Sequence, residues 1–166
     1  MSEPSREPDV RLELYSQPRL LAGARALISN IAQRIGFNEI LCGQISLAID
    51  EALCNIINHG YERRTDGRIW VSIWALGNDP PGLRIVIEDD ARQVDPDSIQ
   101  SRDLDDVRPG GLGVYLIQEI MDQVQYERRP HKGMRLTMVK HLPEDVQDLP
   151  RSPMPAMKTN PEMRSR

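Results

Sequence analysis

The order of the periodic segments is the feature of this sequence that most limits its fold. Apolar residues alternate with polar ones over residues 10–15 and then recur at helical spacing over residues 18–36 and 38–60. Strand-like segments follow at residues 68–76 and 83–88, joined by a turn rich in glycine and proline. Because the helices are grouped rather than alternating with strands, we expect an α/β two-layer sandwich, with a mixed or antiparallel sheet covered on one face by helices.

The second half of the sequence completes this order. Residues 90–111 are too long and too poor in apolar side chains for an ordinary connection, and loops of this kind are commonly lids or binding loops. A helical pattern begins at Leu112, and two further strands are expected at residues 124–128 and 134–141.

The length and the ends of the chain indicate one domain with two tails. A chain of 166 residues is long enough for a single core. Five prolines fall in a polar stretch without periodicity from Leu142 onward. We therefore expect a domain over residues 10–141, a flexible N-terminus at residues 1–9 and a disordered Pro-rich tail at residues 142–166.

Composition argues against several classes of function. The net charge of -4 and the pI of about 5.4 provide no broad basic surface, so we expect no direct nucleic-acid partner. No stretch approaches the roughly 18–20 apolar residues that cross a bilayer, so we expect no membrane partner and a cytoplasmic location. The two cysteines, Cys42 and Cys54, are interpreted as thiols in a reducing compartment.

Polar side chains gather along one flank of the helix predicted over residues 38–60. Glu51 and Asn55 are four residues apart and project as neighbours on the helix surface. Asn55 can offer a neutral oxygen to Mg²⁺, and Glu51 can accept a proton from an attacking hydroxyl or water. The same spacing also suits a solvated helix flank. His59, beside Gly60, suits a helix C-terminus without any ligand role.

Two further positions suit nucleotide chemistry. Asp89 follows an apolar strand, where its carboxylate can accept a hydrogen bond from an exocyclic amine such as that of adenine, although aspartate is also an ordinary turn former. The run Gly110-Gly111-Leu112-Gly113 precedes an apolar helix, so its backbone amides can approach a phosphate closely. The spacing is that of neither a P-loop nor a Rossmann motif, and a flexible hinge explains these glycines equally well.

In this order the motifs resemble those of a known family. Residues 48–61, AIDEALCNIINHGY, are similar to the N box of the GHKL ATPases in the form found in anti-sigma factor serine/threonine kinases. Residues 87–96 resemble the adenine-binding box of these proteins, residues 110–117 the second glycine box, and residues 133–137 the closing strand. The resemblance covers residues from about 10 to 141.

This resemblance implies an ATP-Mg²⁺ site in a GHKL (Bergerat) fold. It assigns Glu51 as the general base, Asn55 as the Mg²⁺ ligand and Asp89 as the adenine partner. It also implies phosphorylation of a small antagonist (anti-anti-sigma) protein on serine or threonine, sequestration of a sigma factor, and a homodimer. The remaining expected nucleotide contacts are Ala91, Thr137 near the base, and Gly110, Gly111, Leu112 and Gly113 around the phosphates.

The adenine-binding box departs from the wider superfamily at two positions. Ala91 and Gln93 stand where the superfamily has glycines. Ala91 adds only a methyl group, which a negative φ accommodates, whereas the Gln93 side chain could obstruct a nucleotide or stiffen the lid. Two hypotheses therefore stay open: an ATP-dependent kinase, and a non-enzymatic module that binds a sigma factor or another regulatory partner and has a decayed nucleotide site.

Overall fold

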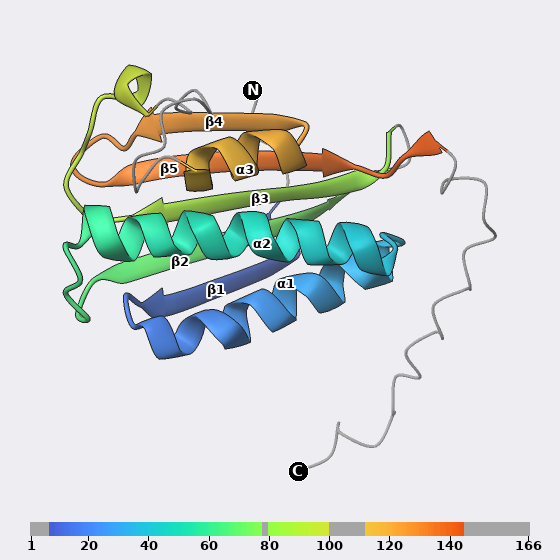
Figure 1. Cartoon of the computed structure of the whole chain (residues 1–166), viewed down its shortest axis with the longest axis horizontal. Coiled ribbons are helices and arrows are strands. Elements are labelled where there is room, and N and C mark those ends of the chain that lie inside the picture. The colour runs from blue at the N-terminus through green and yellow to red at the C-terminus, as the bar shows by residue number, and fades with distance from the viewer. Residues whose placement is uncertain (1–6, 78–79, 100–111, 145–166) are drawn as a thin grey trace, which may run out of the picture.

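Five strands form one sheet, and three α-helices lie against one of its faces, in the part of the chain that the computed structural model describes, residues 7–77, 80–99 and 112–144 (Figure 1). The strands are β1 (Val10–Tyr15), β2 (Arg68–Leu76), β3 (Gly82–Asp89), β4 (Gln123–Arg128) and β5 (Met134–His141). The helices are α1 (Leu21–Ile35), α2 (Glu39–Asn55) and α3 (Leu112–Ile120), with short 3₁₀ turns at Pro18–Leu20 and Pro96–Ser98. The predicted two-layer α/β sandwich is confirmed.

The sheet has the strand order β1-β2-β3-β5-β4, and every neighbouring pair is antiparallel. The predicted β2–β3 hairpin is present, with Leu76 opposite Gly82. Side chains alternate along β2, so Ile69, Val71 and Ile73 lie in the core under the helices. Trp70, Ser72 and Trp74 point to the other face, which carries no helix from the described residues (Figure 1).

The helix α2 crosses the centre of the sheet. Ile45, Ile49 and Leu53 are fully buried there, and the helix also packs against α1 and α3. An 18-residue window of the segment Glu39–Gly60 has a mean hydropathy of 1.5, which is high enough for a membrane span, so the expectation that no stretch comes close is corrected. A position in the core also explains the high hydropathy of this segment, because its buried side chains form the middle of the core.

Capping residues separate α1 from α2. Gly36 ends α1 with a φ of +120°, a conformation that favours glycine. Asn38 then caps α2, since its side chain accepts a hydrogen bond from the Leu41 N–H at 2.9 Å. Both helices therefore begin and end close to the positions that the sequence predicts.

The helix predicted over residues 38–60 is not α-helical throughout. Its last turn widens into a π turn over Ile56–Gly60, closed by a hydrogen bond from the Tyr61 N–H to the Ile56 carbonyl at 2.8 Å. A glycine at a helix end often adopts a left-handed conformation, but here Glu62 and Arg63 adopt it rather than Gly60. The wider turn moves the reversal of the chain beyond Gly60.

The folded region extends slightly beyond the predicted domain limits. The Asp9 N–H donates to the Ile73 carbonyl at 2.9 Å, and its carboxylate accepts from the Ala75 N–H at 2.8 Å. At the other end, Leu142 is 4% exposed, and its N–H bonds the Pro81 carbonyl at 2.9 Å. Leu142, which the sequence places in the tail, is therefore part of the core.

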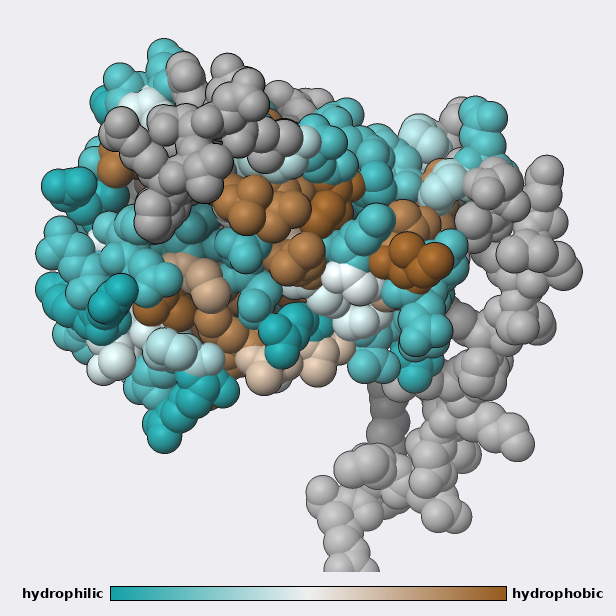
Figure 2. All heavy atoms as spheres, viewed as in Figure 1, coloured by the Kyte–Doolittle hydropathy of each residue, from teal (hydrophilic) through white to brown (hydrophobic). Residues whose placement is uncertain are grey.

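The outer surface of the helix layer mixes apolar and charged side chains (Figure 2). Ile40 and Leu47 on α2 and Leu112 on α3 are exposed. Single exposed apolar residues of this kind are ordinary on a protein surface. The places where the molecule is hollowed are more informative about its function.

Candidate functional site

A cavity of about 270 Å³ lies beside the end of α2, the end of β3 and the strands β4 and β5. Most of its surface is apolar, with a small number of polar groups, as is typical of small-molecule sites. Its lining residues are Ala52, Asn55, Ile56, His59, Gly60, Asp89, Ala91, Arg92, Val94, Ile99, Val114, Tyr126, Met134 and Leu136.

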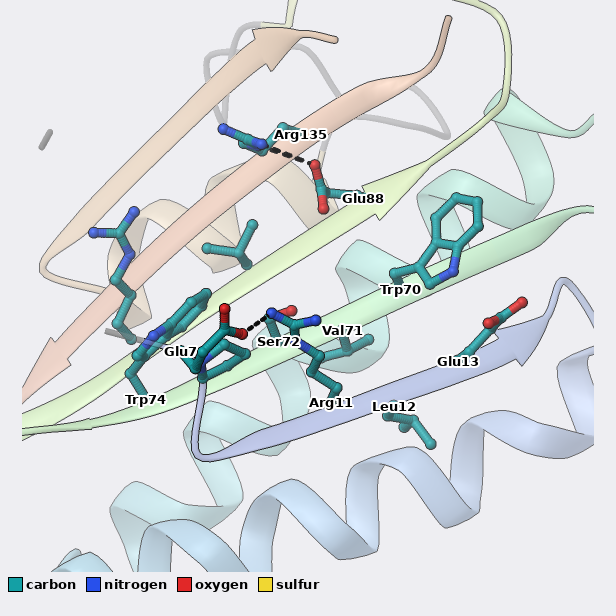
Figure 3. Close-up of a pocket in the computed structure, with 13 residues that line it drawn as sticks. Glu7, Arg11, Leu12, Glu13, Trp70, Val71, Ser72, Trp74, Glu88 and Arg135 are labelled. Carbon is teal, nitrogen blue, oxygen red and sulfur yellow. Dashed lines mark hydrogen bonds and ion pairs between the residues drawn. The ribbon is translucent and has the colours of Figure 1, made fainter. Parts of the chain in front are cut away.

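A larger cavity, about 730 Å³, lies on the face of the sheet opposite the helices (Figure 3). Trp70 and Trp74 line it, and Arg135 and Glu88 form an ion pair across its wall at 3.1 Å. Size alone would favour this cavity as the site. None of the residues predicted from the sequence to contact a ligand lines it, however, so the smaller cavity is the better candidate.

Asp89 is a buried carboxylate in the wall of the smaller cavity. It is 3% exposed, and its Oδ1 accepts hydrogen bonds from the N–H groups of Ala91 at 2.8 Å and Met134 at 3.3 Å. Burial raises the pKa of Asp89, and the two amide hydrogen bonds offset part of this rise. Both hydrogen bonds from described residues to this carboxylate fall on Oδ1, which leaves Oδ2 to a ligand in the cavity.

Two predicted motifs meet beside the cavity. A Cβ added to Gly113, in the first turn of α3, would overlap the Oε2 atom of Glu51 and lie 3.4 Å from the Nδ2 atom of Asn55. Glycine therefore allows α3 to begin directly against these two side chains of α2. Asn55 lines the cavity itself, whereas Glu51 lies one helical turn earlier, beside Gly113.

The other residues of the glycine motif are only partly described. Gly110 and Gly111 lie outside the described residues, as does most of the predicted lid. Leu112 begins α3 and is 61% exposed. The geometry therefore locates Gly113, and it leaves the phosphate contacts of the preceding glycines as a prediction.

Thr137 does not lie at the cavity. Side chains alternate along β5, so Met134 and Leu136 line the cavity, while Arg135 and Thr137 point to the opposite face of the sheet. The register is fixed by antiparallel pairing of Thr137 with Val86 on β3. Thr137 is therefore on the wrong face of the sheet to contact a ligand in this cavity. The residues of β5 that can make such a contact are Met134 and Leu136.

The two departures in the adenine-binding box leave the cavity open. Ala91 lines the cavity, and its methyl group packs against Gly60. A Cβ added to Gly60 would lie 3.0 Å from this methyl group. Neither Ala91 nor Gln93 has a positive φ. The Gln93 Nε2 atom donates to the carbonyls of Arg129 at 2.6 Å and Gly133 at 3.3 Å, and Gln93 does not line the cavity.

Sequence reasoning missed the apolar walls of the cavity, among them Ile56, Val114, Tyr126 and Leu136. Their periodicity marks them as inward-facing residues, but it does not say which end of each element borders the cavity. Burial raises the pKa of Tyr126 to about 12, so its phenol is uncharged at neutral pH. His59, expected to cap or pack at a helix end, is exposed and lines the cavity.

The chain is similar in sequence to proteins named as serine-protein kinases. The chain is 26% identical over 141 residues to serine-protein kinase RsbW of Bacillus subtilis, covering 80% of this chain and 85% of that protein. It is 27% identical over 144 residues to serine-protein kinase RsbW of Listeria monocytogenes, covering 81% and 88%.

Among solved structures, the histidine kinase domain of the Erythrobacter litoralis EL346 blue-light activated histidine kinase aligns with 19% identity and a TM-score of 0.49. This alignment covers 74% of the present chain and 63% of that one, so the chain spans less than two thirds of its length. Residues 14–140 match the histidine kinase-like ATPase domain family. Since this match includes most of the sequence and every helix and strand that borders the cavity in the described residues, the chain belongs to the histidine kinase-like ATPase domain family.

Proposed function

We propose that the protein is a serine/threonine protein kinase that uses ATP and Mg²⁺ and regulates transcription through a partner switch. The observation that carries this proposal is the meeting of Glu51, Asn55 and Gly113 beside the cavity that contains Asp89. The similarity to relatives named as serine-protein kinases supports the same class of activity.

The proposed adenine site centres on Asp89. Its Oδ1 is held by two backbone amides, which leaves Oδ2 to accept a hydrogen bond from the exocyclic amine of adenine. Guanine has a carbonyl oxygen at the equivalent ring position, which would face the carboxylate without a proton between them. The site is therefore expected to prefer ATP to GTP, with the apolar walls against the faces of the base.

The proposed catalytic groups come from α2. Bound ATP-Mg²⁺ would supply the transferable phosphoryl group and the neutralising cation. The Asn55 side chain offers an oxygen ligand at the cavity, and Glu51 accepts the proton of a substrate hydroxyl one turn away. Backbone amides of the segment Gly110–Gly113 are proposed to bind phosphate at the start of α3.

The proposed partners are proteins. By its family resemblance, the chain phosphorylates a small antagonist (anti-anti-sigma) protein on serine or threonine and sequesters a sigma factor. A homodimer belongs to the same proposal. A cytoplasmic location does too, because a sigma factor acts where transcription takes place.

The substitution Glu51→Ala tests the catalytic assignment. Purified protein with labelled ATP, Mg²⁺ and the cognate antagonist should transfer phosphate, and Glu51→Ala should lower the rate by about 100-fold or more. The melting temperature should change by no more than about 2 °C, because Glu51 is partly exposed. Glu39→Ala, at the exposed start of the same helix, is the matched control. Undiminished transfer by Glu51→Ala would remove this residue from its role.

The alternative of a binding module with a decayed nucleotide site was motivated by Gln93. That side chain bonds to the turn between β4 and β5 and leaves the cavity open, so the kinase is the preferred function. Calorimetry with ATP and Mg²⁺ separates the two. The kinase predicts a dissociation constant between about 1 μM and 1 mM, and absence of binding in this range favours the module.

A further inference from the structure

The side chain of Arg129, in the turn that joins β4 and β5, bonds to the end of β3. The Nη1 atom of Arg129 donates to the Asp89 carbonyl at 2.5 Å and to the Asp90 Oδ1 atom at 2.7 Å. Its Nε atom lies 3.4 Å from the Glu88 Oε1 atom. The guanidinium carbon lies 5.3 Å from the centre of the Trp70 ring on β2. One side chain therefore contacts three consecutive residues of the chain around Asp89.

The side chain of Gln93, in the segment after β3, bonds in turn to the backbone of the β4–β5 turn. Its Nε2 atom donates to the carbonyls of Arg129 and Gly133, which are the first and last residues of the turn. The Arg129 N–H also bonds the Gly133 carbonyl at 3.1 Å, which closes the turn on itself. The segment that follows β3 thus holds the backbone of the turn, while the turn holds β3 through the Arg129 side chain.

The backbone of the turn also touches Asp89 directly. Gly133 has a φ of +78°, and a Cβ on this residue would overlap the Asp89 carbonyl oxygen. The next residue, Met134, donates its N–H to the Asp89 Oδ1 atom at 3.3 Å. Both ends of Asp89, the carbonyl and the carboxylate, are therefore fixed by the segment 129–134.

We propose that Arg129 and Gln93 are positioning residues that orient Asp89 for the nucleotide by fastening the segment after β3 to the β4–β5 turn. Neither side chain lines the cavity, so both act through Asp89 rather than on the ligand. Only the identity of the ligand rests on the proposed function. Gln93, which from the sequence alone could obstruct the site, supports it in this arrangement.

The chemistry of these contacts requires these two residue types. Arg129 serves the Asp89 carbonyl and two carboxylates at once, which suits a planar guanidinium with several donors better than a single ammonium group. Its side chain is 26% exposed, so its contacts are partly shielded from solvent. The Gln93 amide acts as a donor to two carbonyls, a role that a glutamate of the same shape cannot fill.

The test uses Arg129→Gln and Gln93→Glu in the full chain, with Arg135→Gln as the matched control. Arg135 pairs with the same Glu88 carboxylate, at 3.1 Å, but from β5 rather than from the turn. Calorimetry should show the dissociation constant for ATP-Mg²⁺ rising about tenfold in Arg129→Gln and about threefold in Gln93→Glu. The control should stay within about twofold of the wild type.

A second measurement does not depend on nucleotide. Hydrogen–deuterium exchange of residues 89–94 in the free protein should become faster in both variants and stay unchanged in Arg135→Gln. In a kinase assay the KM for ATP should rise while kcat stays within about twofold, because the catalytic groups on α2 are not altered.

The outcomes separate this proposal from the proposed function. Unchanged ATP affinity and unchanged exchange in a folded Arg129→Gln variant overturn it. If that variant does not fold, Gln93→Glu gives the same decision, since it keeps the shape of the side chain and replaces its amide donor with a carboxylate. If the wild type binds no ATP, the proposed function fails, and faster exchange at residues 89–94 still supports the anchoring of Asp89 while unchanged exchange refutes it.

Discussion

Asp89 shows, at the scale of a residue, how the demands of a site oppose those of stability. Burial disfavours its charged form and raises its pKa above the ordinary value of 3.8, although two amides donate to it. An acid whose pKa is raised by folding binds its proton more tightly in the folded chain than in the unfolded one. Its contribution to stability is therefore complete at low pH and is lost as the pH rises through the raised pKa.

The variant Asp89→Asn should accordingly be more stable than the wild type at pH 7. Asparagine keeps an oxygen for the two amides and carries no charge to bury. The gain should shrink as the pH falls toward 3.8, and ATP affinity should drop at neutral pH because the free acceptor becomes a donor. Thermal melts from about pH 4 to about pH 8, with exposed Asp66→Asn as control, check this. A stability difference that does not depend on pH would contradict it.

At the scale of an element, the turn between β4 and β5 depends on Gly133 for two independent reasons. Its φ of +78° is unfavourable for residues with a side chain, and the Asp89 carbonyl oxygen occupies the space that a Cβ would need. Arg129 lies in the same turn, and the N–H of Met134, the residue after the turn, donates to Asp89. A substitution that distorts the turn should therefore also alter the cavity.

Gly133→Ala should lower the free energy of unfolding by about 2 kcal/mol or more. Gly23→Ala is the natural counterpart, since Gly23 lies inside α1 with no atom within 4 Å of an added Cβ. That change should raise stability by about 0.5–1 kcal/mol through helix propensity alone. Urea unfolding of both variants measures the contrast. Equal effects at the two glycines would show that the close approach at Gly133 is not maintained in solution.

The elements also show how far sequence reasoning reaches in this protein. Segment order, the Asn38 cap and the Gly36 terminus were predictable because they depend on neighbours in the chain. The face on which Thr137 lies was not, since a shift of one residue in strand register exchanges the two faces of a sheet. The bonds of Gln93 to a turn some forty residues away were equally out of reach.

At the scale of the whole molecule, the sheet separates two different environments. The helices and the smaller cavity occupy one face, while the other carries Trp70, Trp74 and a network of ion pairs (Figures 1 and 3). Arg129 connects the two, because it stacks on Trp70 and bonds the Asp89 carbonyl. The two faces are therefore in contact through the side chain of Arg129.

Because Arg129 stacks on Trp70, we expect the fluorescence of Trp70 to report the binding of ATP. The chain has two tryptophans, so Trp74→Phe leaves Trp70 as the only indole. In that background, titration with ATP-Mg²⁺ should change the fluorescence of Trp70, and Arg129→Gln should abolish the change. A signal of the same size in both proteins would mean that Trp70 responds by another route. If the link holds, binding under the helices is visible from the far side of the sheet without any label.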